Sequence, residues 1–164
     1  MSTINLIKKR ICLEPEYLDS NYKTYLFKKI KDNIQNECNR EYGYFINLKK
    51  IVKIEDNSIT SNSEIIFNVE FEVETLLPEK DKEFECIICM IFVSGIFVNV
   101  KNKLKILLPI SELSNYSYDH ASNSFLSKDK NSKYNSLKKD DVINVKILDL
   151  KYSKKQFSCF GKII

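Results

Sequence analysis

The sequence predicts an α+β protein in which an N-terminal antiparallel sheet with one main helix is followed by a C-terminal OB-fold β-barrel. Three observations lead to this prediction. Residues 64–77 alternate between apolar and polar side chains, which is the period of a half-buried strand. Apolar residues recur every four positions from Tyr22 to Ile34, as on one face of a helix. Five apolar segments between residues 84 and 163 have the length of barrel strands.

The N-terminal half is expected to form one sheet packed against the helix. Residues 19–21, Asp-Ser-Asn, supply side chains that can cap the start of a helix. In residues 64–77 the glutamates alternate with apolar residues, so they face either solvent or a basic partner. In chain order, the expected elements are a strand at 4–13, a helix from the capping residues to about Cys38, a strand from Glu41, turns at 56–58 and 61–63, and the strand at 64–77.

The C-terminal half is expected to form the barrel. The joint from Leu77 to Lys82 is too short to act as a free linker. Gly95 interrupts a long apolar segment, as at a bulge or bend of a barrel strand. The expected domains are therefore 1–80 and 81–164, with barrel strands at 84–93, 95–100, 103–108, 141–150 and 156–163, a turn or short helix at 109–113, and a polar loop at 114–136.

Positive charge is concentrated in the C-terminal half. Residues 1–82 hold 13 basic and 14 acidic residues, whereas residues 83–164 hold 13 basic and 8 acidic residues. This excess favours a polyanionic partner only modestly. No apolar run reaches the roughly 18 residues of a membrane span, and the N-terminus lacks the pattern of a secretory signal. No membrane partner is expected.

The residue types give little support to metal or catalytic chemistry. The five cysteines are scattered, and Cys86 and Cys89 would leave opposite faces of a strand. We interpret them as free thiols rather than as a metal or redox pair. With one histidine and three glycines, the chain offers neither a histidine-based catalytic set nor a Gly-rich phosphate loop. We expect no enzyme activity, no catalytic residue, no metal site and no cofactor.

The strand after Gly95 carries the first candidate binding residues. Phe97 and Asn99 alternate there with apolar residues, so a core on the apolar side would place the ring of Phe97 in solvent. An exposed aromatic ring on an OB surface can stack a nucleic-acid base for roughly 1–3 kcal/mol with little sequence preference. Phe97 and Asn99 are therefore candidate RNA-binding residues.

Three lysines follow at alternate positions. If Lys101, Lys103 and Lys105 lie on a strand, their ammonium groups share one face near Phe97, where they would attract a phosphate backbone. The alternative is that these lysines only keep the barrel soluble. His120 is a further RNA-binding candidate, and the same surface would be extended by Phe92, Tyr116, Tyr118 and the hairpin at 151–155.

Seven segments stand in a characteristic order along nearly the whole chain. They are LEPEYL at 13–18, EYGYFI at 41–46, SGIFV at 94–98, PIS at 109–111, YD at 118–119, LKKDDVI at 137–143 and FSCFG at 157–161. In this order they resemble one family, the stalk subunit of multisubunit RNA polymerases. This family comprises the seventh subunit of eukaryotic RNA polymerase II and its archaeal counterpart.

The resemblance implies a non-catalytic polymerase subunit. An N-terminal tip, a truncated RNP-like domain, would dock on the polymerase core near the clamp, with Tyr42, Gly43 and Tyr44 as contact candidates. The OB domain would bind nascent RNA near the exit path, with Phe97 at the position where related domains present an aromatic ring. The implied partners are the core subunits, a fourth-subunit-like stalk partner where one exists, and nascent RNA.

Location and two other functions stay open. Frequent Lys, Asn and Ile indicate an AT-rich genome, so the expected location is the nucleus for a cellular protein, or the virion or a cytoplasmic viral factory for a large DNA virus. A free-standing OB-fold RNA-binding factor, such as a translation factor or RNA chaperone, would explain residues 84–161 but not the first half. An assembly scaffold that never touches RNA is the third possibility.

Overall fold

The computed structural model forms two units, Ser2–Leu77 and Pro78–Ile164. It describes residues 2–164, except for the side chains of residues 56 and 57. Both units are built mainly of strands, and each has its own buried apolar core. Within the described residues, no helix is long and apolar enough to cross a membrane.

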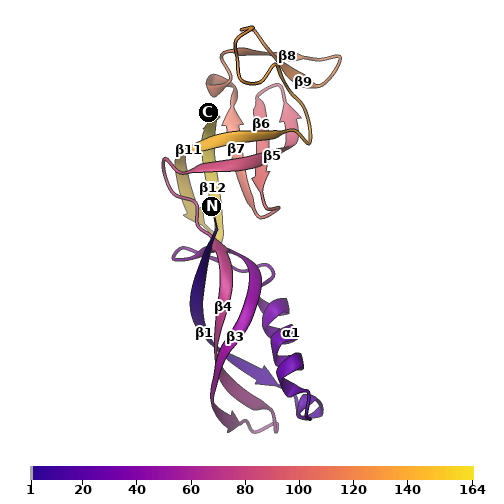
Figure 1. The fold of residues 1–164 in the computed structure, drawn as a ribbon, viewed down its shortest axis with the longest axis vertical. Coiled ribbons are helices and arrows are strands. Elements are labelled where there is room, and N and C mark those ends of the chain that lie inside the picture. The colour runs from indigo at the N-terminus through magenta and orange to yellow at the C-terminus, as the bar shows by residue number, and fades with distance from the viewer. Residues whose placement is uncertain (1) are drawn as a thin grey trace. The chain divides into compact units, whose positions relative to one another are not determined.

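The first unit is a four-stranded antiparallel sheet in the order β1-β4-β3-β2, accompanied by one α-helix (Figure 1). This layout is compatible with the sheet and main helix that the sequence predicts. The strands are β1 (Thr3–Leu13), β2 (Cys38–Asn39), β3 (Gly43–Ile59) and β4 (Ile65–Leu76).

The helix α1 (Tyr22–Ile34) packs its apolar stripe against the sheet. Leu26, Ile30 and Ile34 are buried in one cluster with the inward residues of β1 and β4. Full burial of a Leu or Ile side chain contributes about 1.5–3 kcal/mol, so this stripe holds the helix in place. The helix ends before the expected Cys38, because residues 38–39 pair as β2 with the start of β3.

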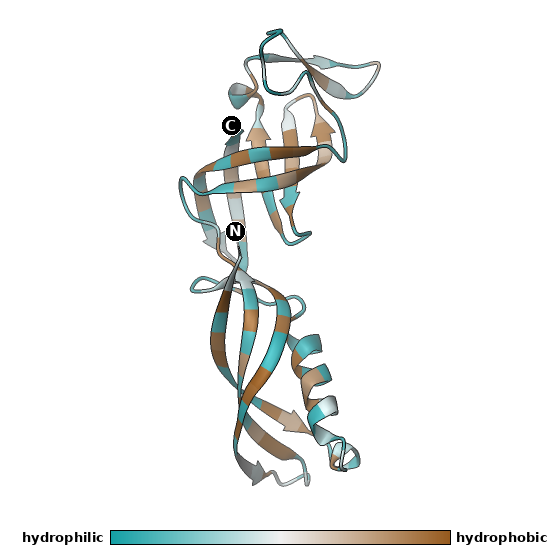
Figure 2. Ribbon diagram, in the orientation of Figure 1, coloured by the Kyte–Doolittle hydropathy of each residue, from teal (hydrophilic) through white to brown (hydrophobic). Residues whose placement is uncertain are grey.

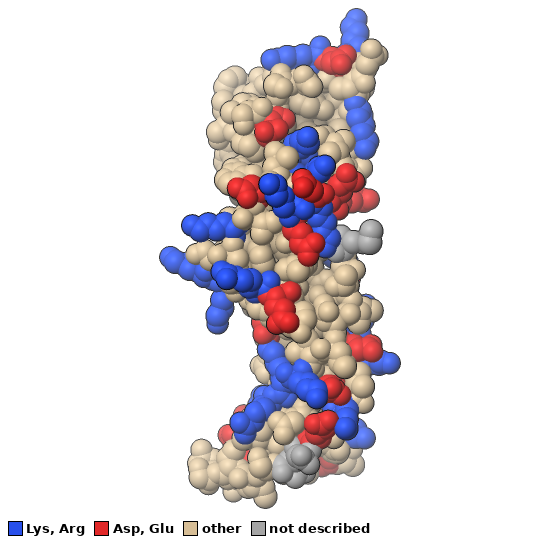
Figure 3. Space-filling view, turned by 90° about the vertical axis from the view of Figure 1, so that its left-hand side faces the viewer, with Lys and Arg blue, Asp and Glu red and all other residues tan. Residues whose placement is uncertain are grey.

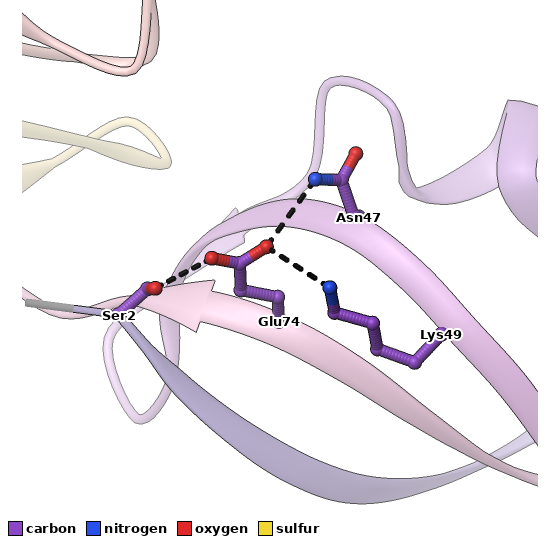
Figure 4. Close-up of polar contacts among 4 residues, drawn as sticks. All are labelled: Ser2, Asn47, Lys49 and Glu74. Atoms are coloured by element: carbon purple, nitrogen blue, oxygen red, sulfur yellow. Dashed lines mark hydrogen bonds and ion pairs between the residues drawn. The ribbon is translucent and has the colours of Figure 1, made fainter.

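The acidic face of β4 is covered by polar and basic side chains of its own unit. Glu74 accepts hydrogen bonds from Ser2 Oγ at 2.5 Å and Asn47 Nδ2 at 3.2 Å, and its carboxylate lies 3.7 Å from Lys49 Nζ (Figure 4). These contacts remove the need for a separate basic partner on this face. Two further ion pairs join β4 to its neighbouring strands, Glu70–Lys8 at 3.3 Å and Glu72–Lys50 at 4.0 Å.

Strand β3 is longer than the sequence predicts. The expected turn at residues 56–58 is wrong, because their backbone stays in β3 and pairing with β4 continues as far as Ile59 opposite Ile65. Four register irregularities along β3 indicate β-bulges, which add residues to one strand without breaking the ladder. The chain reverses instead at residues 61–63, where the second turn cluster was expected.

The second unit contains a closed barrel of five strands in the order β11-β12-β7-β6-β5, and β11 pairs with β5 to close it. Inward apolar residues alternate with outward residues, as the bands along β5 and β11 show in Figure 2. Such a barrel is consistent with the predicted OB-fold. Its strands are β5 (Glu83–Phe92), β6 (Gly95–Val100), β7 (Leu104–Pro109), β11 (Val142–Ser153) and β12 (Gln156–Ile163).

The segment between β7 and β11 is not the polar loop that the sequence predicts. After a short 3-10 helix at Ile110–Glu112, it forms a three-stranded sheet in the order β10-β9-β8. Leu113, Phe125 and Leu137 are fully buried there, and three such side chains among many polar ones gave no clear periodic signal. The strands are β8 (Tyr116–Asp119), β9 (Ser124–Ser127) and β10 (Ser136–Leu137).

Candidate nucleic-acid interface

Four apolar side chains form a continuous row across the outer face of the barrel. The strand registers place Met90 of β5 beside Phe97 of β6. Leu107 of β7 pairs with Phe97 on one side and with Phe160 of β12 on the other. Met90 and Phe160 are 43% and 47% exposed, and the other two are half-buried. We call these four residues the apolar row. Contiguous exposed apolar surface of this kind marks an interaction site.

A β-bulge turns part of this row outward. Ile88 is fully buried, so uninterrupted alternation along β5 would point Met90 into the core. The register with β6 shifts between Ile88 and Met90, which makes Cys89 the extra residue and brings Met90 to the outer face. The local sequence does not predict Met90 on this face, because nothing in it reveals the bulge. It does not predict Leu107 and Phe160 either, because their place beside Phe97 depends on the strand order.

Phe97 lies on the outer face of β6, between the buried Ile96 and Val98. Its ring is half-buried and does not stand free in solvent as expected, because the ring of Phe92 lies edge-on to it. The two ring centroids are 6.1 Å apart and the ring planes are perpendicular, at 90°. Phe92 is 46% exposed. Edge-to-face contact holds the two rings in fixed orientations, so they form an ordered aromatic surface on which a base can stack.

A second row, parallel to the apolar row, brings two polar side chains beside the rings. Its members are Ile87 of β5, Asn99 of β6 and Lys105 of β7, which pair in register. We call these three residues the polar row, after Asn99 and Lys105. The Oδ1 atom of Asn99 is buried and has no hydrogen-bond partner among the described residues. A buried carbonyl oxygen without a donor costs about 1–3 kcal/mol, so rotation of the Asn99 side chain toward a bound nucleotide would give this atom a donor.

Of the three candidate lysines, Lys105 alone lies on a strand. Strand β7 begins at Leu104, so Lys101 and Lys103 belong to the turn between β6 and β7. Lys101 has a φ of 52°, and the backbone N–H of Lys103 donates to the Val100 carbonyl at 3.1 Å. The expectation that the three ammonium groups share one strand face is therefore wrong. Reversal of the chain between the paired strands places two of them at the hairpin tip.

His120 lies off the barrel strands, in the turn between β8 and β9. Its ring stands edge-on to Tyr118, with centroids 4.7 Å apart, and the Tyr118 ring also contacts the buried Phe125. The Tyr118 hydroxyl donates to Asn123 Oδ1 at 2.6 Å. His120 and Tyr118 thus form a small aromatic surface on the three-stranded sheet that is separate from the apolar row.

Tyr42, Gly43 and Tyr44, the expected core-docking residues, lie where β2 turns into β3. The two tyrosines are half-buried, and the ring of Tyr42 packs edge-on against Phe45 with centroids 6.5 Å apart. Gly43 is buried with a φ of 78°, and a Cβ atom there would overlap the Leu76 carbonyl oxygen. The fold alone therefore requires this glycine, whatever its part in docking.

Cys86 and Cys89 lie on opposite sides of β5. Cys86 is in the barrel core, where burial raises the pKa of its thiol to about 12. The Cys89 thiol donates to the Phe97 carbonyl at 3.2 Å. All five cysteines are free, and the described part of the chain contains no group of three or more side chains placed to hold a metal ion.

The barrel is matched by one family model. The S1 RNA binding domain model matches residues 77–160, just over half of the 164-residue chain. The chain belongs to the S1 RNA-binding domain family. The matched range includes every residue of the apolar row and of the polar row beside it. The S1 domain supports binding to RNA by this unit. No curated protein matches the chain.

The electrostatic attraction of the S1 domain for RNA is diffuse. Residues 78–164 hold 15 Lys and 10 Asp or Glu. Basic and acidic side chains are interspersed on the side of the molecule drawn in Figure 3. Long-range attraction is therefore modest, and contact with the aromatic rings must supply much of the affinity.

Substitution of Lys105 should reduce the salt dependence of RNA binding. Each lysine–phosphate contact contributes about 0.7 to the slope of log K against log salt for a single strand. We expect the Lys105→Gln protein to show a slope smaller by about that amount, measured by fluorescence anisotropy over a salt series. Lys31→Gln, which removes an exposed lysine of α1, is the charge-matched control. Equal slopes for the two variants would exclude Lys105 from the interface.

Proposed function

We propose that this protein is a non-catalytic stalk subunit of a DNA-directed RNA polymerase whose S1 domain holds nascent single-stranded RNA on the apolar row. The main support for the RNA role is the apolar row. It presents outward apolar and aromatic side chains on four adjacent strands of an S1 domain, with Asn99 and Lys105 beside them.

The chemistry of this face suits RNA of any sequence. A base can stack on the face of one of the two perpendicular rings, Phe92 or Phe97, since every base has a π-face. Once the Asn99 side chain turns outward, its unpartnered Oδ1 atom can accept a hydrogen bond from a base amino group or a 2′-hydroxyl. The ammonium group of Lys105 can contact a phosphate. Such contacts select single strands without selecting sequence, as a nascent transcript requires.

The polymerase part of the proposal is supported by the order of the seven segments that resemble the stalk subunit. It is also supported by the first unit, which has its own core and which an RNA-binding S1 domain by itself does not need. In this proposal the first unit docks on the polymerase core through the Tyr42–Tyr44 region, and a fourth-subunit-like partner joins it where one exists. Polymerisation is catalysed by other subunits. The expected location is the nucleus, or the virion or viral factory of a large DNA virus.

Purification from the native source tests the polymerase role. A tagged chain should co-elute with the large polymerase subunits at high salt, and ultraviolet crosslinking of the same complex should join the S1 domain to nascent transcript. Elution as a free protein that still binds RNA would instead identify a free-standing OB-fold RNA-binding factor. Co-elution without any crosslink to transcript would identify an assembly scaffold.

A further inference from the structure

The sheet of the first unit has an open edge along β3. The short strand β2 pairs only with Gly43 and Tyr44, at the start of β3. Further along, as far as Ile59, β3 pairs with β4 on one side. In the described part of the chain, no strand pairs with its other side. An open strand edge presents backbone N–H and C=O groups that another strand can pair with.

A groove of about 680 Å³ lies along this edge. Five consecutive residues of β3, Ile51–Glu55, line it together with Tyr22 and Lys23 of α1 and Phe67 of β4. Successive side chains of a strand point to opposite faces, so a groove lined by five residues in a row runs along the strand edge. At about 3.3 Å per residue, these five span about 16 Å, which is the length of a short β-strand.

Apolar side chains line part of the groove, although polar atoms make up most of its exposed surface. The ring of Tyr22 stacks on that of Phe67, with centroids 5.8 Å apart and an angle of 17° between the ring planes. Ile51 and Ile54 are half-buried, and Val52 is 48% exposed. When a strand adds to a sheet edge, main-chain hydrogen bonds give affinity and pockets for alternate side chains give specificity. This groove offers both.

The elements that form the groove carry part of the positive charge of the first unit. Helix α1 and strand β3 together hold seven Lys and three Asp or Glu, whereas residues 2–77 as a whole hold 11 Lys or Arg and 12 Asp or Glu. Lys23 and Lys53 line the groove itself, with Glu55 paired to Lys53 at 2.9 Å. Lys49 and Lys50 are paired with Glu74 and Glu72 of β4. The groove itself therefore keeps one net positive charge, from Lys23, and a negative group is complementary to it.

The opposite edge of the same sheet is different. The middle of β1 carries three consecutive charged residues, Lys8, Lys9 and Arg10. Charged side chains are a common means of keeping an edge strand from pairing with another chain. Along the groove on β3, three of five consecutive residues are Ile51, Val52 and Ile54. Strand β3 also carries charged residues, at Lys49, Lys50 and Lys53, so the groove distinguishes the β3 edge rather than a lack of charge.

We propose that the β3 edge binds an extended acidic segment of a partner protein, which pairs with Ile51–Glu55 as an additional strand and places alternate apolar side chains in the groove beside Tyr22 and Phe67. A protein strand is favoured over RNA because the groove follows a backbone edge, whose alternating donors and acceptors match another peptide backbone. This inference concerns the first unit alone and goes beyond the RNA-binding role of the S1 domain.

A fluorescein-labelled decapeptide of alternating valine and glutamate is a suitable probe. We expect it to bind the full chain and to shift the NMR signals of the amides at residues 51–55. N-methylation of all valine nitrogens blocks one edge of this peptide, and N-methylation of all glutamate nitrogens blocks the other. One of the two methylated peptides should lose at least about tenfold in affinity, whereas the other keeps it. Equal binding of both, or no binding of the parent at about 1 mM, would overturn the proposal.

Two pairs of variants locate the binding site. Val52 is skipped by the register with β4, which passes from Ile51 to Lys53. Val52→Pro therefore removes one backbone N–H of the groove segment without removing a register pair to β4, and it should abolish peptide binding, whereas Val52→Thr should not. Lys23→Glu should weaken binding at least about fivefold, and Lys31→Glu, a reversal outside the groove, should change it little.

Competing occupants would give distinct results. If a single-stranded RNA displaces the peptide from residues 51–55, or if the chain dimerises through this edge at concentrations below the peptide Kd, the proposal is wrong. Loss of RNA binding in a Phe97 variant leaves peptide binding unchanged under this proposal, so failure of one role is distinguishable from failure of the other.

Discussion

Replacement of Phe97 by alanine should weaken binding of a single-stranded RNA by about 5- to 150-fold, which corresponds to the roughly 1–3 kcal/mol of one base-stacking contact. Phe97 stands at the centre of the apolar row, between Met90 and Leu107, and its ring is held edge-on by Phe92. The substitution therefore removes the stacking surface and also releases the second ring. Fluorescence anisotropy with a labelled pyrimidine oligonucleotide measures the change.

Two further variants make this experiment decisive. Phe97→Tyr keeps an aromatic ring and should bind RNA nearly as well as the unchanged protein. Ile59→Ala removes an apolar side chain that is 74% exposed at the end of β3, in the first unit, and should bind normally. Thermal unfolding followed by circular dichroism checks that all three variants keep the fold. A Phe97→Ala protein that is folded and binds RNA with unchanged affinity would remove the row from the interface.

Replacement of Gly43 by alanine should destabilise the first unit by about 3–5 kcal/mol. The φ of 78° is a conformation that L-residues adopt at a cost. The added Cβ would overlap the Leu76 carbonyl oxygen and lie 2.7 Å from the Leu77 Cα atom. Both obstacles belong to the backbone at the end of β4, so no side-chain rotation can relieve them. Denaturant unfolding monitored by tyrosine fluorescence gives the difference in the free energy of unfolding.

Comparison with two other substitutions separates the causes. Ser63 has a φ of 63° but is exposed in the turn between β3 and β4, so Ser63→Ala should cost less than about 1 kcal/mol. Gly43→Asn suits the left-handed backbone but still adds the Cβ. It should therefore be nearly as damaging as Gly43→Ala. If Gly43→Asn is tolerated, the close approach of β3 to Leu76 does not control stability.

The barrel was predictable because the apolar residues of its strands follow a pattern that is visible in each strand by itself. Segments such as 95–100 alternate strictly, and both of its expected ends agree with β6. The small sheet between β7 and β11 was not predictable, because Ser, Asn and Tyr residues surround the few buried side chains. Its strands form through contacts with one another, and local propensity does not encode them.

The candidate interface was predictable only in part, for a related reason. Alternation within β6 placed Phe97 and Asn99 on the outer face correctly. Their neighbours depend on which strands lie side by side and in what register. The parallel pairing of β12 with β7 brings Phe160 into the row, although Phe160 is more than 60 residues from Phe97 in the sequence. Lys101 and Lys103 were placed on a strand face because they alternate with Lys105. Residues 101–103 instead form the turn between β6 and β7.

The hairpin between β11 and β12 turns on two lysines and no glycine. Lys154 and Lys155 have φ angles of 51° and 59°, the backbone form for which two-residue hairpin tips prefer Asn-Gly. Each lysine in this form costs about 1–2 kcal/mol relative to an ordinary conformation. In exchange, two ammonium groups are carried at the very end of a rigid arm, and the unfolded chain has less freedom there than a glycine would give it.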